Sequence, residues 1–250
     1  MSDNSGGKFL IAICLDRTGS MAAYRDQTVS GFNEFLHQQQ ADPNGEVWLS
    51  LTLFDRPGNE NEIEERFVAR PILEIPDLGT PANPYHPRGN TPLYDAIGVT
   101  VRACERLEGK YDRVLFVIQT DGDENSSRDW TRTAIFDLIT AKRAQGWAFI
   151  FMGADQDAFS ASVAMGVAAG STMSYVSSHA EAAFAAASSG TSVYRSMRGA
   201  TADSFFTTEP PPTSAPSGPG SATAKSKARR PRPGVSSRKP NPHTDDRSHQ

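Results

Sequence analysis

The sequence lacks the features of membrane and secreted proteins. None of the apolar runs in its 250 residues approaches the ~20 residues that a membrane-spanning helix needs. The N-terminus, residues 1–7, has neither the basic nor the apolar region of a signal peptide, and we expect it to be flexible. The only cysteines, Cys14 and Cys104, do not make a disulfide framework and are predicted to be buried free thiols. We therefore expect a cytoplasmic protein that does not enter a membrane.

The sequence also lacks the motifs of a histidine metal centre and of a phosphate-binding loop. The five histidines are scattered, and no metal-ligand spacing joins them. The chain contains no Gly-rich loop of the kind that cradles phosphate groups, and no internal repeat. These absences count against a histidine-rich metal centre and against a nucleotide-type phosphate site.

The formal net charge of −4 conceals an acidic body and a basic tail. Residues 207–250 carry eight Lys or Arg and three acids, a charge of +5, which leaves −9 on the remainder. This Pro- and Ser-rich tail has few apolar residues and no periodicity, so it cannot bury enough surface to offset its ordering entropy. We predict that it is disordered. Nucleic-acid binding through the tail is an alternative function, although no aromatic residue interleaves its basic charges.

Residues 8–200 are predicted to form one α/β domain. Apolar runs typical of buried strands alternate with segments of helical periodicity. Strands are predicted at residues 9–15, 47–54, 114–118, 147–152 and 172–176, and helices around residues 29–36, 93–107, 135–139, 157–166 and 178–197. This alternation favours a mostly parallel sheet with helices on both faces. The more polar stretch 62–70 is predicted to be an antiparallel strand at the sheet edge, where charge is tolerated.

Three segments place side-chain oxygens where they can meet. Asp16, Thr18 and Ser20 follow the first predicted strand, Asp121 follows the strand at 114–118, and Thr91 opens a predicted helix. Ligands of open α/β sheets bind beyond the carboxyl ends of the strands, so neighbouring strands would bring these loops to one crevice. Hard oxygen ligands suit a divalent cation, Mg²⁺ first, with Mn²⁺ or Ca²⁺ as alternatives. Because hydroxyls neutralise no charge, the ion would keep an open position for the Asp or Glu of a partner protein.

These motifs resemble the von Willebrand factor A domain and its metal-ion-dependent adhesion site. The family motif Asp-x-Ser-x-Ser stands here as Asp16-x-Thr18-x-Ser20, the isolated Thr of the family matches Thr91, and Thr-Asp-Gly matches residues 120–122. The resemblance covers roughly residues 8–200 and is greatest to stand-alone bacterial and phage members. It implies a Rossmann-like sheet with one antiparallel edge strand. It also implies direct metal ligation by Thr18, Ser20 and Thr91, and ligation by Asp16 and Asp121 either directly or through water.

A metal-dependent protein-binding module, rather than an enzyme, is therefore the leading hypothesis. The enzyme alternative is a magnesium-dependent phosphatase or hydrolase on a Rossmann-like fold. Haloacid-dehalogenase-like phosphatases also place an Asp after the first strand, but they need a second Asp two residues later, where this chain has Thr18.

Two local alternatives concern the helix start and the third motif. Thr91 before Pro92 is also typical of a helix cap, with Pro92 at the first helical position. Asp123, Glu124 and Asn125 are predicted to form a rim or an outer layer around the site rather than to act as ligands.

Overall fold

The structure is a computed structural model that describes residues 7–59, 62–121, 124–154, 157–175 and 180–196. The chain divides into two units, residues 1–211 and 212–250, and every described residue belongs to the first. The predicted flexible N-terminus, apart from Gly7, and the predicted disordered tail at 207–250 lie outside the described residues.

The described residues form a six-stranded sheet with the strand order β3-β2-β1-β4-β5-β6. Five strands run parallel: β1 (Lys8–Asp16), β2 (Glu46–Asp55), β4 (Arg113–Thr120), β5 (Ala148–Ala154) and β6 (Thr172–Tyr175). The charged strand β3 (Glu62–Pro71) pairs antiparallel with β2 at one edge. The structure thus confirms a mostly parallel sheet with one antiparallel edge strand.

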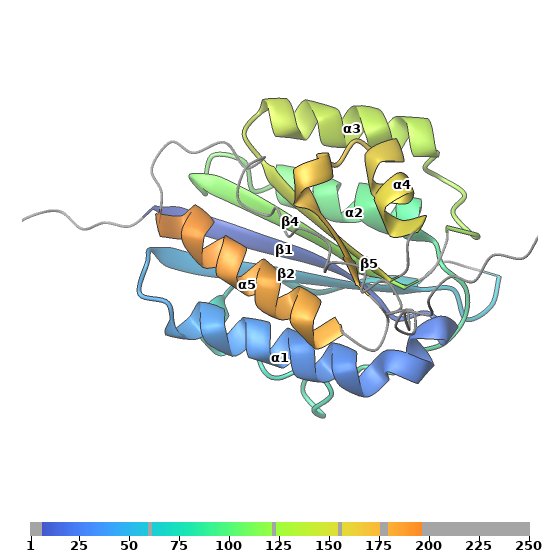
Figure 1. The fold of residues 1–250 in the computed structure, drawn as a ribbon, viewed down its shortest axis with the longest axis horizontal. Helices are drawn as coiled ribbons and strands as arrows, with labels where there is room; N and C mark the ends of the chain where they lie inside the picture. Colours follow the sequence, from blue (N-terminus) through green and yellow to red (C-terminus); the bar gives the residue numbers. More distant parts are fainter. Residues whose placement is uncertain (1–6, 60–61, 122–123, 155–156, 176–179, 197–250) are drawn as a thin grey trace, which may run out of the picture. The chain divides into compact units, whose positions relative to one another are not determined.

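Helices cover both faces of this sheet (Figure 1). One face carries α1 (Arg25–Ala41) and α5 (Ala180–Ser196), and the other carries α2 (Leu93–Glu105), α3 (Arg132–Ala144) and α4 (Asp157–Ala164). A short 3-10 helix, Gly19–Tyr24, leads from β1 into α1 and was not predicted from the sequence. None of the helices in the described part of the chain combines the length and apolarity of a membrane span.

Alternate residues of β1 supply the two halves of the hydrophobic core. Phe9, Ile11, Ile13 and Leu15 pack on the side of α1 and α5. Leu10, Ala12 and Cys14 pack on the side of α2 and α3, and all seven are buried. A strand buried on both faces has to be apolar at every position, which explains its continuous apolar sequence. Both cysteines are buried free thiols, as predicted.

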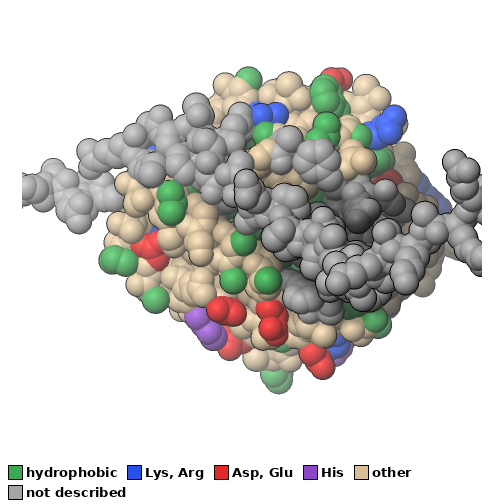
Figure 2. Space-filling model, in the orientation of Figure 1, with side chains coloured by type: hydrophobic (Ala, Val, Ile, Leu, Met, Phe, Trp, Pro, Cys, Tyr) green, Lys and Arg blue, Asp and Glu red, His purple; other side chains and the backbone are tan. Residues whose placement is uncertain are grey.

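The outer surface over α1 is acidic. Figure 2 shows Asp and Glu side chains along the lower edge of the molecule, over α1. Asp26 and Glu34 lie on this helix and are exposed, and the exposed His37 contacts Asp77 at 2.8 Å. Part of the acidic character of the domain therefore lies on the exposed face of α1, the helix that follows the Asp16–Ser20 segment.

Candidate functional site

The candidate site lies where the chain leaves the central strands. β1 lies between β2 and β4, so the connections that leave this part of the sheet run to opposite sides. Ligands of open α/β sheets bind at such a switch point, beyond the carboxyl ends of the strands. Asp16 is the last residue of β1, and Asp121 directly follows Thr120, the last residue of β4. The strand pairing therefore brings two of the three predicted motifs side by side.

Hydrogen bonds join four of the five predicted ligands into one cluster. The Thr18 N–H donates to Asp16 Oδ1 at 2.7 Å, and the hydroxyls of Thr18 and Ser20 lie 3.2 Å apart. Ser20 Oγ donates to Asp121 Oδ1 at 2.8 Å, across a sequence separation of 101 residues. Thr120 Oγ1 donates to Asp16 Oδ2 at 2.6 Å. The first and third motifs thus meet directly.

Asp16 is a wholly buried carboxylate with no positive partner among the described residues. Its neighbour Arg17 directs its guanidinium away from the site, to Asp55 at 2.7 Å. Burial raises the pKa of Asp16 to about 7, and the charge of Asp121 adds to the rise, although hydrogen bonds from Thr120 and Thr18 act in the opposite direction. A carboxylate in this environment is stabilised by any cation that reaches it.

The loop that contains Thr91 contacts the Asp16–Ser20 segment through its backbone. The Gly19 N–H donates to the Gly89 carbonyl at 2.9 Å, which fixes the loop of the second motif against that of the first. The Thr91 N–H donates to Asn125 Oδ1 at 2.9 Å, and the Asn125 N–H donates back to the Thr91 carbonyl at 3.1 Å. Thr91 is buried, but within the described residues its hydroxyl forms no hydrogen bond to the other four predicted ligands.

Thr91 does not cap the following helix. α2 begins at Leu93 with Pro92 as its N-cap, and no side-chain cap bond is formed there. The prediction of Pro92 as the first helical residue is therefore wrong, and the alternative role of Thr91 as a helix cap is not observed. The Thr91 hydroxyl accepts no hydrogen bond from the free N–H groups at the start of α2.

Glu124, from another loop, caps the N-terminus of α2 with its side chain. Its carboxylate accepts hydrogen bonds from the N–H groups of Tyr94, Ser126 and Ser127 at 2.7–3.0 Å, and from Ser127 Oγ at 2.6 Å. A carboxylate at a helix N-terminus also complements the helix dipole. Glu124 and Asn125 thus form an outer layer that holds the second motif, as predicted, while Asp123 lies outside the described residues.

Asp95 holds the rest of this loop. Its buried carboxylate accepts hydrogen bonds from the N–H groups of Arg128, Asp129 and Trp130 at 2.8–3.0 Å. Trp130 packs against Gly98, where a β-carbon would collide with the indole ring. Sequence reasoning missed this role, although a carboxylate among buried apolar helix positions was a signal for it.

Tyr85 is a second contact that sequence reasoning missed. Its side chain is fully buried, and its hydroxyl donates to the Asp16 carbonyl at 2.5 Å. It comes from the loop at 76–90, and it ties that loop to the end of β1. An aromatic residue in a loop otherwise rich in Pro, Gly and Asn was the available signal.

Comparison with solved structures assigns the fold. The vWF domain of the type V pili tip protein Mfa5 from Porphyromonas gingivalis matches with a TM-score of 0.55 and 9% identity, over 79% of this chain and 99% of that one. The chain has a von Willebrand factor type A fold. No family model matches the sequence, and no curated protein is similar to it in sequence.

This chain also matches parts of two larger proteins of known structure. The pilus adhesin SpaC from Lactobacillus rhamnosus GG matches with a TM-score of 0.54 and 13% identity, over 73% of this chain and 30% of that one. The proximal thread matrix protein 1 from the mussel byssus matches with a TM-score of 0.52 and 11% identity, over 74% of this chain and 47% of that one. The chain thus spans about half the length of the mussel protein. Identities this low show the fold alone.

The donors at the strand ends of this von Willebrand factor type A fold fit a small divalent cation. Ligands of an octahedral Mg²⁺ at roughly 2.0–2.1 Å from the ion lie about 2.9 Å from one another. The contacts Thr18 Oγ1–Ser20 Oγ and Ser20 Oγ–Asp121 Oδ1 measure 3.2 and 2.8 Å, so these oxygens already have such a spacing. Within the described residues, no group of three or more His, Cys, Asp and Glu side chains is arranged so that it could hold a metal ion. The candidate site has two carboxylates and is completed by hydroxyls.

Proposed function

We propose that this chain is a protein-binding module that engages a carboxylate of its partner through a divalent cation, Mg²⁺ first. The observation that carries the proposal is the oxygen cluster formed by Asp16, Thr18, Ser20 and Asp121, in which the buried Asp16 carboxylate has no positive partner within the part of the chain that the structure describes. Ser20 is exposed and Asp121 is half-buried, so the cluster opens to solvent on one side. Thr91, whose loop is joined to the Asp16–Ser20 segment by the Gly19–Gly89 hydrogen bond, is the fifth proposed ligand.

The composition of the site favours binding over catalysis. A bound cation would supply an electrophilic position that attracts an outside Asp or Glu. At most two carboxylates would lie near the ion, and the hydroxyl ligands would neutralise none of its charge, so the ion would stay electrophilic enough to attract that group. A phosphatase of the haloacid-dehalogenase type needs a carboxylate as general acid and base where Thr18 stands, and the Thr18 hydroxyl is engaged with Ser20. We therefore propose a non-enzymatic role.

A capture experiment in two cation conditions tests the proposal. The full chain is immobilised and exposed to a lysate in Mg²⁺ or in chelator, and the bound proteins are compared by mass spectrometry. We expect a partner that is retained in Mg²⁺, released by chelator and absent with Asp121→Ala. Asp137→Ala, on the exposed side of α3, is the matched control and should capture as the wild type does. Capture that is indifferent both to chelator and to Asp121→Ala would refute the proposal.

A further variant, Asp16→Asn, separates binding from hydrolysis. The enzyme alternative predicts turnover of a phosphate ester in Mg²⁺ that is lost in Asp16→Asn. We expect no turnover above the uncatalysed rate, in a preparation that still binds Mg²⁺ and its partner.

A further inference from the structure

A network of ion pairs lies directly beside the candidate site. It alternates three arginines with three carboxylates from three parts of the chain. Its members are Arg17, Asp55, Glu62, Glu64, Arg66 and Arg88. Their formal charges cancel. The candidate site uses none of these side chains as a ligand, so the network needs a separate explanation.

Asp55, the last residue of β2, is the centre of this network. Its side chain is fully buried. One carboxylate oxygen accepts from Arg17 Nη2 at 2.7 Å, and the other accepts from Arg88 Nε at 2.6 Å. The Arg17 side chain is 6% exposed and that of Arg88 is 45% exposed. The Asp55 carboxylate is therefore strongly coupled to the buried Arg17 guanidinium, because little water screens that pair, while the half-exposed Arg88 is held more by the geometry of its charged hydrogen bond.

The two arginines belong to two different segments of the candidate site. Arg17 lies between the proposed ligands Asp16 and Thr18, and Arg88 lies three residues before Thr91. The Arg88 N–H also donates to the Arg17 carbonyl at 2.9 Å. Asp55 therefore joins the first segment to the second through the side chains of Arg17 and Arg88, neither of which is a proposed ligand.

We propose that Asp55 is a positioning residue that holds the Asp16–Ser20 loop and the Arg88–Thr91 loop at the separation that a Mg²⁺ site requires. This inference rests on the proposed function. It adds that cation selectivity depends on a carboxylate that is not a ligand. Removing a residue that orients a metal ligand typically lowers the metal affinity by about 10–100-fold.

Two substitutions in the network distinguish a positioning role of Asp55 from a simple effect of charge on cation affinity. Asp55→Asn removes a negative charge near the cation, whereas Arg88→Gln removes a positive one. Electrostatics alone therefore makes Asp55→Asn bind the cation more weakly and Arg88→Gln bind it more tightly. Loss of positioning makes both variants bind more weakly, because each cuts the Asp55 link between the loops.

The choice of cation gives a second discriminating readout. Mg²⁺ demands nearly octahedral geometry at roughly 2.0–2.1 Å, whereas Ca²⁺ accepts a more flexible arrangement at roughly 2.3–2.6 Å. Loosened loops should therefore weaken Mg²⁺ binding more than Ca²⁺ binding. A variant that is merely less stable, but still folded, has no reason to change the ratio of the two affinities.

Calorimetric titration of the full chain with Mg²⁺ and with Ca²⁺ tests the inference. The matched control is Glu105→Gln, because Glu105 also bridges two cations, with Arg102 at 2.7 Å and Lys142 at 3.0 Å. Glu105 ends α2, about 18 Å along the helix axis from Leu93 at the site end. We expect Asp55→Asn and Arg88→Gln each to weaken Mg²⁺ binding about tenfold, with a smaller loss for Ca²⁺. Glu105→Gln should leave both affinities within about twofold of the wild type.

Each outcome decides one question. Tighter Mg²⁺ binding by Arg88→Gln would overturn positioning in favour of charge alone. Equal losses for Mg²⁺ and Ca²⁺ would also overturn positioning, because they would show that the geometry that Mg²⁺ requires is not what the variants disturb. If Asp55→Asn and Arg88→Gln bind both cations as Glu105→Gln does, Asp55 has no role in cation binding. Arg88→Gln changes a half-exposed side chain, so it carries the test if Asp55→Asn does not fold. A wild type that binds neither cation would refute the proposed function itself, and this inference with it.

Discussion

Asp16→Asn should stabilise the protein in chelator while abolishing its response to Mg²⁺. Burial raises the pKa of Asp16 from 3.8 to about 7. At about 1.4 kcal/mol per pKa unit, this rise corresponds to about 4 kcal/mol against the ionised carboxylate. Asn removes the charge and keeps the shape, and Thr120 Oγ1 can accept from the new amide. Because a buried amide also costs free energy, we expect a net gain of about 1–3 kcal/mol at pH 8.

The pH dependence of this difference has a definite sign. The folded state binds the Asp16 proton more tightly than the unfolded state, because its pKa is raised on folding. The corresponding stability is fully present below about pH 4 and is lost as the pH rises through about 7. The advantage of Asp16→Asn over the wild type in chelator should therefore be small at pH 5 and largest at pH 8.

Urea denaturation in chelator and in Mg²⁺ measures both effects. Asp95→Asn is the matched control, since Asp95 is also buried but accepts three backbone hydrogen bonds. The same substitution should destabilise the protein there, by about 2–3 kcal/mol. The reasoning is refuted if Asp16→Asn is less stable than the wild type at pH 8 in chelator, or if Mg²⁺ stabilises this variant as much as the wild type.

Three further changes test individual contacts. Tyr85→Phe leaves the Asp16 carbonyl without its buried donor and should cost about 1–3 kcal/mol by urea denaturation; an unchanged midpoint would contradict the tie between loop and strand. Gly89→Ala should cost at least about 1 kcal/mol, because Gly89 has a φ of +72° and its added β-carbon would meet the Arg56 carbonyl; a neutral effect in the same assay would contradict this close approach. Mg²⁺ at about 100 times its dissociation constant should stabilise the wild type by about 2.7 kcal/mol, seen as a melting temperature that rises with Mg²⁺; a constant value would argue against binding to the folded state.

Much of the fold could be predicted because its strands and helices differ in their local pattern. β1 is apolar at successive positions since both of its faces are covered, and this pattern distinguishes it from the polar edge strand β3. The register between distant strands was not available from such patterns. It is this register that places Asp121 within 2.8 Å of Ser20.

The surroundings of the site could be predicted only in part. The motif residues were visible in the sequence, but the ion pairs of Asp55 join residues 33 and 38 positions apart and depend on how β2 lies beside β1. The capping role of Glu124 at α2 was not predicted for the same reason, because Glu124 reaches this helix from a loop 30 residues away from Tyr94. Long-range partners of this kind leave no periodic signal in a single sequence.

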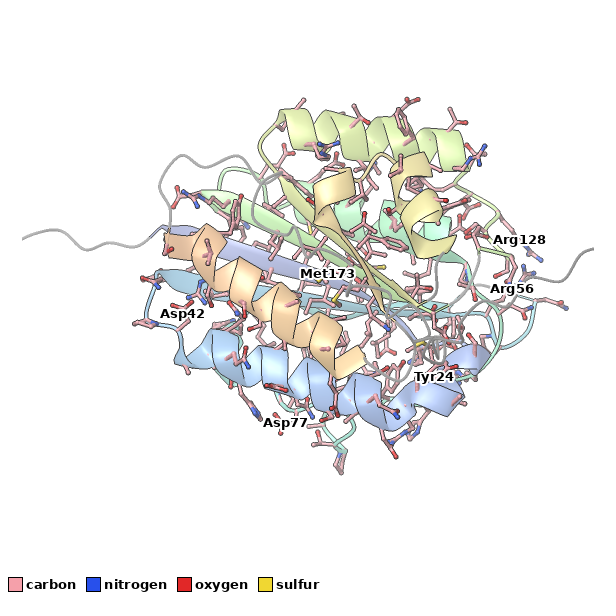
Figure 3. All side chains as sticks on the ribbon, viewed as in Figure 1. Tyr24, Asp42, Arg56, Asp77, Arg128 and Met173 are labelled. Carbon is pink, nitrogen blue, oxygen red and sulfur yellow. The ribbon has the colours of Figure 1, made fainter. Side chains whose placement is uncertain are left out.

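The site can be located at the end of the sheet from labelled side chains in Figure 3. Arg56 and Arg128 lie at one end of the molecule, and Asp42 lies at the other. Arg56 directly follows β2, and Arg56 Nη1 donates to the Ser126 carbonyl at 3.1 Å, beside the loop that holds Thr91. The proposed contact with a partner is therefore expected at the end that carries Arg56 and Arg128.

Anomalous scattering from crystals grown in Mn²⁺ is the most direct test of a cation held between these loops. The account predicts one strong peak in contact with Thr18 Oγ1 and Ser20 Oγ, close to Thr91 and Asp121, and no such peak in crystals of Asp121→Ala. Mn²⁺ absent from this position at millimolar concentration, or bound there equally in Asp121→Ala, would contradict it.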